Sequence, residues 1–489
     1  MTEIAPEQAV APDLSHTPVR DFTLRSAFAL AFSDVSPIVG IYSVFGLCLV
    51  VAGPAFFWGF PVVLIGQLAV TGVFGDLVSK WPFQGSVYAW ARQLFGARYG
   101  WFANWAYSWG LVIAMGAVAL FAAEFLGPAI GLNSLTETQT SLLALGVLVF
   151  GTIANMIGSK FLRGLLYVSM TAELISSLGI GIALLFFHRA HSFSFLFSGA
   201  GTAHGAGWLF GPFLAIVAFI GFSFVGFESA GSIAEEVQGA RHVLPKAISL
   251  SLLTVGLLVM FATLGLLLAL PDLGAVLSGS DKNPIATTLE ARLGGGTGRA
   301  LLVMLTIGFT ASMIAVQAAV SRAIWASARA RELPVSGLLG RLSGAERLPR
   351  HVIGLTCIIA GILVFIHNAN VFTLLLSAAT AGFFVSYALP VVAAAITRLR
   401  GGWTPGPVSM GKAAATVTYF AAIWMIAEII NIAWPRNTYG GVWYLNWGIV
   451  LAIVVLGVVG AMVSTFVFRR GGEAVTAQFE PVVTDPEGE

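Results

Sequence analysis

Apolar residues form long runs along this chain, and the polar stretches between them are short. A helix that crosses a membrane needs about 20 mostly apolar residues. The runs lack the alternation of a membrane β-barrel strand, so the pattern predicts an all-α integral membrane protein. The twelve predicted transmembrane helices lie at about 27–51, 54–75, 99–130, 141–158, 164–187, 209–236, 245–270, 299–326, 352–367, 371–397, 411–434 and 442–468.

The placement of Lys and Arg predicts how these helices are oriented, because basic residues concentrate in cytoplasmic loops. With residue 1 inside, most of the 25 Lys and Arg residues fall on the cytoplasmic side. The residues expected on the outer side are Arg189, Lys282, Arg292, Arg299 and Arg436. We therefore expect a multi-pass protein of the inner or plasma membrane, with both termini in the cytoplasm.

Composition supports a membrane protein and excludes several other classes. Only 10% of the residues are charged, whereas a soluble domain carries about 25%. Residues 1–25 contain no signal-peptide core and are expected to form a cytoplasmic tail, as are residues 471–489. Cys48 and Cys357 lie in apolar runs and are expected to be packing residues. The sequence contains no metal-ligand cluster, phosphate-binding loop, nucleophile elbow or basic tract, so we expect no enzyme, no cofactor, no metal and no nucleic-acid partner.

Two predicted helices carry helix-breaking residues near mid-membrane. In the first helix Pro37 removes a backbone donor and Gly40 tolerates non-helical angles. In the sixth, Gly221 and Gly226 bracket Ser223. Backbone groups freed in lipid are tolerated only beside a cavity or inside protein, and a matched pair of such breaks predicts the binding site of a transporter. The alternative is a pair of kinked helices that pack closely through glycine.

Apart from Glu235 and Glu236 at the cytoplasmic end of the sixth helix, five acidic residues fall within the predicted helices, and no Lys or Arg lies centrally. They are Asp34, Glu124, Glu173, Glu228 and Glu428. A charge at the bilayer centre costs about 2.5 kcal/mol or more, and burial favours the neutral form of a carboxyl group. A buried acid is therefore suited to exchanging a proton, and the excess of acids favours a substrate with a cationic group.

We assign these acids different roles. Glu228 follows the break in the sixth helix and is the predicted proton-coupling residue; alternatively, it is a buried Glu that ties this helix to its neighbours. Asp34 either pairs with a substrate amine or caps the broken first helix. Glu173 is a second candidate for a proton or cation site, and Glu124 and Glu428 are expected to be structural.

Charged residues at the cytoplasmic helix ends are either a solvated face or an inner gate, whose ion pairs break when the site opens inward. The six gate candidates are Asp76, Glu235, Glu236, Lys246, Arg322 and Arg329.

Ordered motifs along helices one to eight resemble those of the amino acid–polyamine–organocation (APC) permease superfamily. The motifs are 53–54 (GP) with 58–59 (WG), 82–90 (PFQGSVYAW), 226–229 (GFES) with 234–236 (AEE) and 244–248 (LPKAI), and 321–322 (SR) with 328–329 (AR) and 333–334 (LP). The motif at 53–54 and 58–59 is similar to one found in the bacterial amino acid/choline transporter subgroup. The resemblance implies a LeuT-type fold, in which two inverted repeats of five helices (26–187 and 188–397) have broken helices one and six, and two further helices (398–470) follow.

The resemblance also implies a substrate site. Matched to exchangers for arginine and agmatine, the implied contacts are Ser36, Ile38, Val39 and Gly40 of the first helix, Tyr107, Gly110, Leu111 and Met115 of the third, Phe222, Ser223 and Val225 of the sixth, and Val316 of the eighth. Phe222 falls on the aromatic gate of the family, and Ser223 and Val225 on positions that offer carbonyl oxygens to an amino group.

The sequence departs from the family at three places. The family's Gly-Ser/Thr-Gly is Ile38-Val39-Gly40 here, which removes a hydroxyl from the implied site for a substrate carboxylate. The fifth helix has Glu173 and no Lys, which many relatives carry in place of sodium. Ser312 matches one of two sodium-binding hydroxyls, and Ala311 cannot supply the other.

The sequence thus predicts a secondary active transporter of a small amino acid or amine, working by alternating access and coupled to protons. An exchanger without ion coupling, sodium coupling, a nutrient sensor that does not transport its ligand, and an ion channel are the alternatives.

Overall fold

The computed structural model describes residues 20–132, 135–201, 205–281, 283–344, 346–366, 369–436 and 443–470. Most of the predicted N-terminal tail (1–19), the predicted C-terminal tail (471–489) and Lys282 lie outside the described residues. Throughout the described ranges the regular structure is helical, apart from isolated bridges between Phe22 and Val237 and between Ser343 and Leu348.

Long helices make up the body of the protein. They are α4 (Gly59–Lys80), α6 (Ala97–Ala129), α7 (Glu137–Ile157), α8 (Ser159–Ile182), α12 (Ala240–Ala269), α15 (Gly295–Arg329), α17 (Arg350–Leu363), α18 (Ala369–Leu399), α19 (Ala414–Ala433) and α21 (Gly448–Arg470).

Shorter helices connect or interrupt the long ones. They are α1 (Leu24–Val35), α2 (Pro37–Tyr42), α3 (Phe45–Ala52), α5 (Val87–Phe95), α9 (Gly205–Trp208), α10 (Leu214–Ile220), α11 (Ser229–Ser232), α13 (Leu273–Leu277), α14 (Pro284–Leu293), α16 (Ser336–Leu339) and α20 (Trp443–Asn446). Single turns of 3₁₀- or π-helix complete the path: η2 (Pro54–Trp58), η3 (Ala183–Phe187), η4 (Phe193–Phe197), η5 (Leu209–Phe213), η6 (Gly221–Phe224), η7 (Ala234–Glu236) and η8 (Gly411–Ala413).

Within the described residues, 11 helical segments are long and apolar enough to cross a membrane. The predicted span at 352–367 corresponds to α17, which has 14 helical residues and is shorter than a typical span. The expected all-α membrane architecture is confirmed, whereas the count of twelve and the inverted repeat remain predictions.

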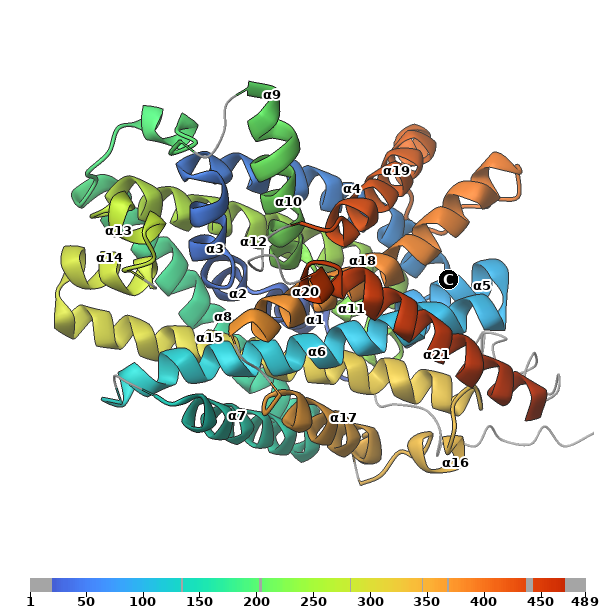
Figure 1. The fold of residues 1–489 in the computed structure, drawn as a ribbon. Coiled ribbons are helices and arrows are strands. Elements are labelled where there is room, and N and C mark those ends of the chain that lie inside the picture. Colours follow the sequence, from blue (N-terminus) through green and yellow to red (C-terminus); the bar gives the residue numbers. More distant parts are fainter. Residues whose placement is uncertain are drawn as a thin grey trace, which may run out of the picture.

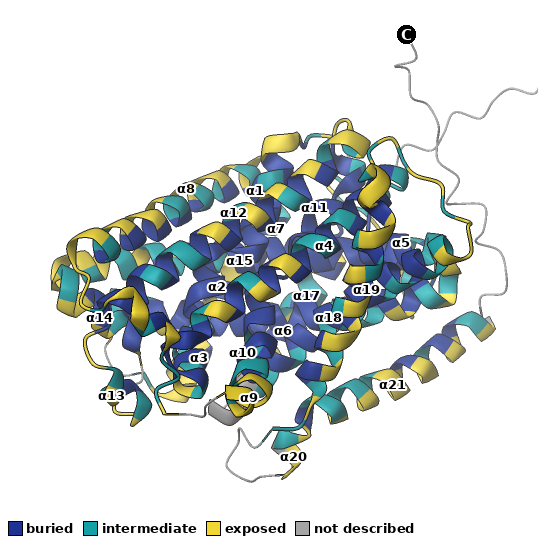
Figure 2. Cartoon of the chain, turned by 90° about the horizontal axis from the view of Figure 1, so that it is seen from above, coloured by how far each residue is buried: buried dark blue, intermediate teal, exposed yellow. Residues whose placement is uncertain are grey.

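The helices form one elongated bundle around α6 and α15. Figure 1 shows α6 and α15 running side by side along its length, with α7 and α17 together on one side and α4 and α19 on the other. The burial pattern in Figure 2 places α1, α2 and α11 in the interior and leaves much of α21 exposed along an edge. The helices beside the interruptions are therefore enclosed, which suits irregular backbone, because its polar groups cannot face lipid.

Two interruptions lie next to each other inside this bundle. The first falls at Ser36, which has a φ of +49° and separates α1 from α2. Pro37 occupies the first position of α2, where a missing N–H is tolerated. In the second, η6 runs into extended backbone at Val225 and then Gly226, whose φ is +100°. Since α2 packs against η6, the two interruptions meet.

Candidate binding site between the two interrupted helices

A buried acid fastens the first interruption to α8. The Ser36 hydroxyl donates a hydrogen bond of 2.5 Å to Glu173 Oε2, and the Ser169 hydroxyl donates one of 2.8 Å to Glu173 Oε1. The Ser36 oxygen also accepts a hydrogen bond of 3.2 Å from the Val39 N–H and so caps α2. Glu173 is fully buried, so its two hydroxyl partners satisfy a group that has no access to water.

A serine and a glycine join the two interruptions directly. The Ser223 hydroxyl donates a hydrogen bond of 2.7 Å to the Gly40 carbonyl oxygen. A Cβ atom on Gly40 would come within 2.9 Å of a Val259 methyl group and 3.3 Å of the Ser223 carbonyl oxygen. The close approach of the two segments therefore requires glycine at this position.

Two tyrosines hold the carboxyl group of Glu228. Tyr107 on α6 donates a hydrogen bond of 2.7 Å to Glu228 Oε1, and Tyr387 on α18 donates one to Oε2. The Tyr387 oxygen also accepts a hydrogen bond of 2.9 Å from the Gly226 N–H, at the centre of the second interruption. The Glu228 carbonyl oxygen accepts one of 3.1 Å from the Ser86 hydroxyl. Glu228 thus connects the second interruption to α6, α18 and the loop before α5.

Asp34 presents an unsatisfied oxygen at the first interruption. It lies in the last turn of α1 with only 5% of its surface exposed. Its carbonyl oxygen accepts a hydrogen bond of 3.2 Å from Ser312 on α15, but Oδ2 has no hydrogen-bond partner within the described structure. A buried polar atom without a partner is costly, so this oxygen is available to a ligand or a proton.

A small cavity of about 10 Å³ lies beside Asp34, where the two interruptions face α6, α15 and α18. It is lined by the polar residues Asp34 and Ser312, the rings of Phe222 and Phe383, and the small aliphatic residues Val35, Val39, Ala114, Val118, Val225 and Val316. This volume holds about one water molecule. The walls must therefore move apart before a larger molecule can enter.

The residues expected at the site divide into two groups. Asp34, Val39, Phe222, Val225, Ser312 and Val316 line the cavity. Ser36, Ile38, Gly40, Tyr107, Gly110, Leu111, Met115 and Ser223 are buried in the surrounding contacts and do not line it.

Packing explains the second group. A Cβ on Gly308 of α15 would come within 2.4 Å of an Ile38 methyl group, so Ile38 faces this helix. Gly110 lies where α6 crosses α18, and its Cβ would meet the Phe383 N–H nitrogen at 3.1 Å. The α6 residues that line the cavity are Ala114 and Val118, and not the expected Leu111 and Met115.

Two aromatic residues of α18 were not expected at the site. Phe383 lines the cavity, and Tyr387 holds Glu228. One signal for Tyr387 was available in the sequence, because a phenol in an apolar span needs a hydrogen-bond partner inside the protein. Nothing in the local pattern indicates which partner it has.

Four of the six gate candidates form two ion pairs at one end of the bundle. Glu236 pairs with Arg322 at 2.7 Å, and Glu235 pairs with Arg329 at 2.8 Å. Burial by itself raises the pKa of Glu235, but the hydrogen bonds and charge of Arg329 outweigh it and lower this pKa below its ordinary value of 4.5. Both pairs link the segment after α11 to α15.

The other two gate candidates are placed differently. Asp76 pairs with Arg398 at 2.6 Å and accepts a hydrogen bond from the Met410 N–H, which joins α4 to α18 and the segment before α19. Lys246 is exposed on α12.

A further ion pair lies beside those of Glu235 and Glu236 and was not expected. Glu332 pairs with Arg92 at 2.9 Å and accepts a hydrogen bond of 2.7 Å from the Tyr88 hydroxyl. Burial raises the pKa of Glu332 despite the opposing charge of Arg92. This pair fixes α5 to the end of α15 beside the two gate pairs.

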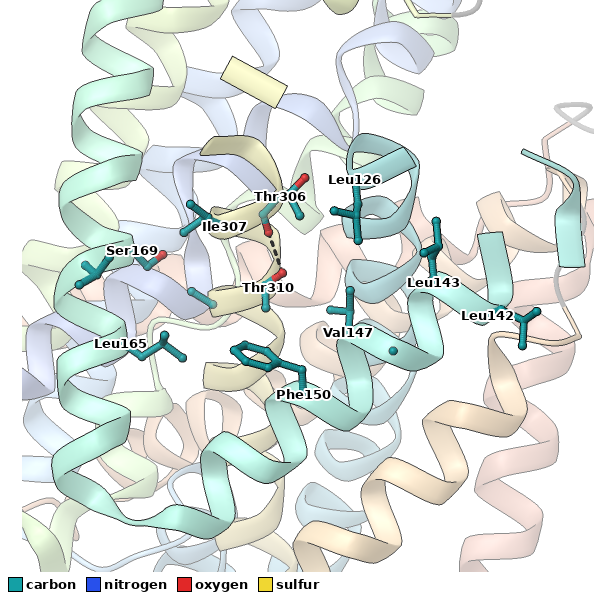
Figure 3. A pocket seen from close by; sticks show the side chains of 13 residues that line it. Leu126, Leu142, Leu143, Val147, Phe150, Leu165, Ser169, Thr306, Ile307 and Thr310 are labelled. Atoms are coloured by element: carbon teal, nitrogen blue, oxygen red, sulfur yellow. Dashed lines mark hydrogen bonds between the residues drawn. The ribbon is translucent and has the colours of Figure 1, made fainter. Parts of the chain in front are cut away.

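A larger cavity of about 540 Å³ lies elsewhere, between α6, α7, α8 and α15. Figure 3 shows its apolar lining, with Phe150 among the side chains drawn, and the hydrogen bond of 2.7 Å from Thr310 to the Thr306 carbonyl oxygen. The Thr306 hydroxyl likewise bonds to its own helix, and Ser169 bonds to Glu173. A charged ligand would find no free polar partner there, so this cavity suits apolar groups alone.

The 11 long apolar helices of the described residues define the fold as that of a multi-pass membrane protein. The sequence model described as "Amino acid permease" matches residues 22–469, and the chain belongs to this family, within the APC superfamily. The expected superfamily is therefore confirmed.

Relatives with similar sequences carry transporter names. The chain is 23% identical to the amino-acid permease BAT1 of Arabidopsis thaliana, over 85% of this chain and 86% of the relative. It is 25% identical to an uncharacterized amino-acid permease of Schizosaccharomyces pombe, over 90% of this chain and 82% of the relative. It is also 23% identical to the thiamine transporter thi9 of the same yeast, over 85% and 78% of the two chains.

Proposed function

We propose that the protein is a secondary active transporter that moves a small amine or amino acid across the inner or plasma membrane by alternating access. The observation that carries this proposal is the cavity between the two interruptions, with an unpartnered Asp34 oxygen in its wall. Interrupted helices in a membrane bundle are typical of midplane binding sites in transporters. The relatives named as amino-acid permeases and as a thiamine transporter support a substrate of this size and chemistry.

In the proposed cycle, the present structure corresponds to an occluded state. In this proposal the ion pairs of Glu235 and Glu236 close the end of the bundle that we assign to the cytoplasm, and Phe222, which lines the cavity, is the outer gate. Opening to the cytoplasm requires the ion pairs to break as the segments around α1 and α11 move away from α15.

We further propose that Glu228 couples the cycle to protons. Its carboxyl group bridges the second interruption and the two helices that carry Tyr107 and Tyr387. A charged carboxylate accepts both phenol hydrogen bonds more strongly than a neutral acid does. Loss or gain of the proton therefore changes how firmly the interruption is held, and a proton can bias one state only through such a difference.

Counterflow in proteoliposomes tests the proposal. Vesicles loaded with unlabelled amines or amino acids should accumulate the labelled compound when they contain the full-length protein. A pH gradient should increase net uptake. Counterflow that is active but indifferent to the gradient would identify an exchanger without ion coupling, and binding without any counterflow would identify a sensor.

A further inference from the structure

We infer that the transported substrate is an organic cation without a carboxylate group. This inference rests on the transporter function proposed above and narrows its substrate class. It follows from which polar groups at the two interruptions are already used by the protein and which are left free.

The start of α2 is the first place where a substrate carboxylate could bind, because N–H groups at the start of an interrupted helix are suited to anions. Here the protein satisfies these donors itself. Pro37 has no N–H, and the Ile38 N–H faces the carboxyl group of Glu173. An acidic side chain of the protein therefore already lies at the position that an anion would take.

The next two donors of α2 are also occupied. The Val39 N–H donates to the Ser36 side-chain oxygen at 3.2 Å, and the Gly40 N–H donates to the Ser36 carbonyl oxygen at 2.9 Å. The first turn thus offers a substrate no free N–H, and the side chains of Ile38 and Val39 bring no hydroxyl.

Polar groups at the second interruption are also hydrogen-bonded within the protein. The Gly226 N–H donates to the Tyr387 hydroxyl at 2.9 Å, and the Tyr107 and Tyr387 hydroxyls donate to Glu228. The cavity lining contains no Lys, Arg or His. A carboxylate in this cavity would lie beside the acid Asp34, and no basic side chain in the lining would balance its charge, which is unfavourable in a water-poor site.

A cation, by contrast, finds partners. Asp34 lines the cavity, and its buried Oδ2 has no hydrogen-bond partner within the described structure. The hydroxyl of Ser229 lies near this carboxyl group and is likewise unpartnered there, so it can orient toward a carboxylate that binds a cation. The rings of Phe222 and Phe383 lie in the same wall and can attract a positive charge through their faces. The remaining lining is aliphatic and suits the carbon skeleton of an amine.

Matched pairs of compounds that differ by one carboxylate test this inference. The thermal unfolding temperature of the purified full-length protein is measured with cadaverine against lysine, putrescine against ornithine, and tyramine against tyrosine. A ligand that binds the folded state and not the unfolded state raises this temperature, and the rise grows with the logarithm of the ligand concentration above its Kd. We expect at least one amine to raise it, and its carboxylated partner to leave it unchanged. The stabilising amine should also drive counterflow.

Variants then assign the effect to this cavity. Asp34→Asn should weaken the apparent affinity for the stabilising amine by roughly tenfold or more, since a charge-assisted hydrogen bond is lost. Phe222→Leu keeps an apolar side chain and should weaken it by about two- to fivefold. Glu428→Gln is the control, because Glu428 is equally buried but lies on α19, away from the cavity.

The outcomes separate this inference from the proposed function. If a carboxylated partner stabilises and exchanges as well as its amine, the inference is wrong and the transporter function stands. If the effect of the amine survives both Asp34→Asn and Phe222→Leu, the cation site assigned here is wrong. If no compound of either kind stabilises the protein or exchanges, the proposed transport of amines and amino acids fails, and the inference fails with it.

Discussion

The Tyr107 hydroxyl lies 2.7 Å from Glu228 Oε1 and donates a hydrogen bond to it, although the two residues belong to segments far apart in the sequence. Tyr387 holds the other oxygen of the same carboxyl group. Glu228 is thus hydrogen-bonded to two long helices, α6 and α18. A change in its charge therefore acts directly on the contact between the second interruption and these helices.

This contact predicts that Glu228→Gln flattens the pH dependence of uptake. Glutamine resembles the neutral carboxyl group in shape and cannot release a proton, so the variant should behave alike over the pH range in which wild-type uptake changes. Initial uptake rates in proteoliposomes at a series of pH values measure this. An unchanged pH profile would remove Glu228 from the coupling mechanism.

Glu235→Gln provides a contrasting prediction. Burial opposes the charge of Glu235, but Arg329 lowers the pKa below 4.5, so the folded-state pKa lies below the unfolded one. The stabilisation from this ion pair is then complete above the unfolded pKa and is lost only as the pH falls through the folded-state value. Above about pH 5 the variant should change the uptake rate but keep the wild-type shape of the pH profile. A flattened profile would show that the gate, and not Glu228, senses pH.

The two tyrosines should differ in importance. Tyr387→Phe leaves both the Glu228 oxygen and the Gly226 N–H without their partner, whereas Tyr107→Phe affects one Glu228 oxygen. Each unsatisfied buried group costs about 1–3 kcal/mol. Tyr387→Phe should therefore lower the thermal unfolding temperature and the uptake rate more than Tyr107→Phe does. The reverse order would contradict the hydrogen-bond assignment.

Gly226→Ala should abolish uptake. The φ of Gly226 is +100°, and a Cβ there would lie 2.8 Å from Asp34 Oδ1, so alanine strains the backbone and pushes against the site. Gly146→Ala is the matched control, since a Cβ on Gly146 meets no atom within 4 Å. The control should transport at the wild-type rate. Normal uptake by Gly226→Ala would mean that the second interruption tolerates an ordinary residue.

Breaking the buried gate pair should favour the state that is open to the cytoplasm. Glu236→Gln leaves the charge of Arg322 buried without its partner, which costs about 3–5 kcal/mol in comparable pairs. Thiol labelling of a Ser232→Cys variant that lacks Cys48 and Cys357 reports the opening, because Ser232 is fully buried near the gate. Labelling from the cytoplasmic side should accelerate when Glu236→Gln is added. Equal rates would argue against a gating role.

Much of this architecture could be anticipated from the sequence, because its strongest signals are local. Apolar length predicts spanning helices, and Pro37 and Gly226 mark places where a helix cannot continue smoothly. Asp34 and Glu228 stand out because acids are rare in apolar segments. These residues do lie at or beside the cavity, but their roles in transport remain predictions.

The features of the site that the sequence did not predict depend on contacts between distant segments. Whether Ala114 or Met115 faces the cavity is set by the rotation of α6 against its neighbours, which periodicity cannot resolve in a helix that is apolar all round. Phe383 resembles many other phenylalanines in the chain, and only the packing of α18 against η6 brings it to the site. Likewise, no local pattern in the sequence indicates that Asp76 forms its ion pair with Arg398 and takes no part in the gate ion pairs.

A structure of the full-length protein with its most strongly stabilising amine tests the proposed cation site most sharply. We expect ligand density in an enlarged cavity between the two interruptions, with the ammonium group within hydrogen-bonding distance of Asp34 and flanked by Phe222 and Phe383. Density in the apolar cavity between α6, α7, α8 and α15, or a site between the interruptions that stays closed and empty while the amine is bound elsewhere, would contradict it.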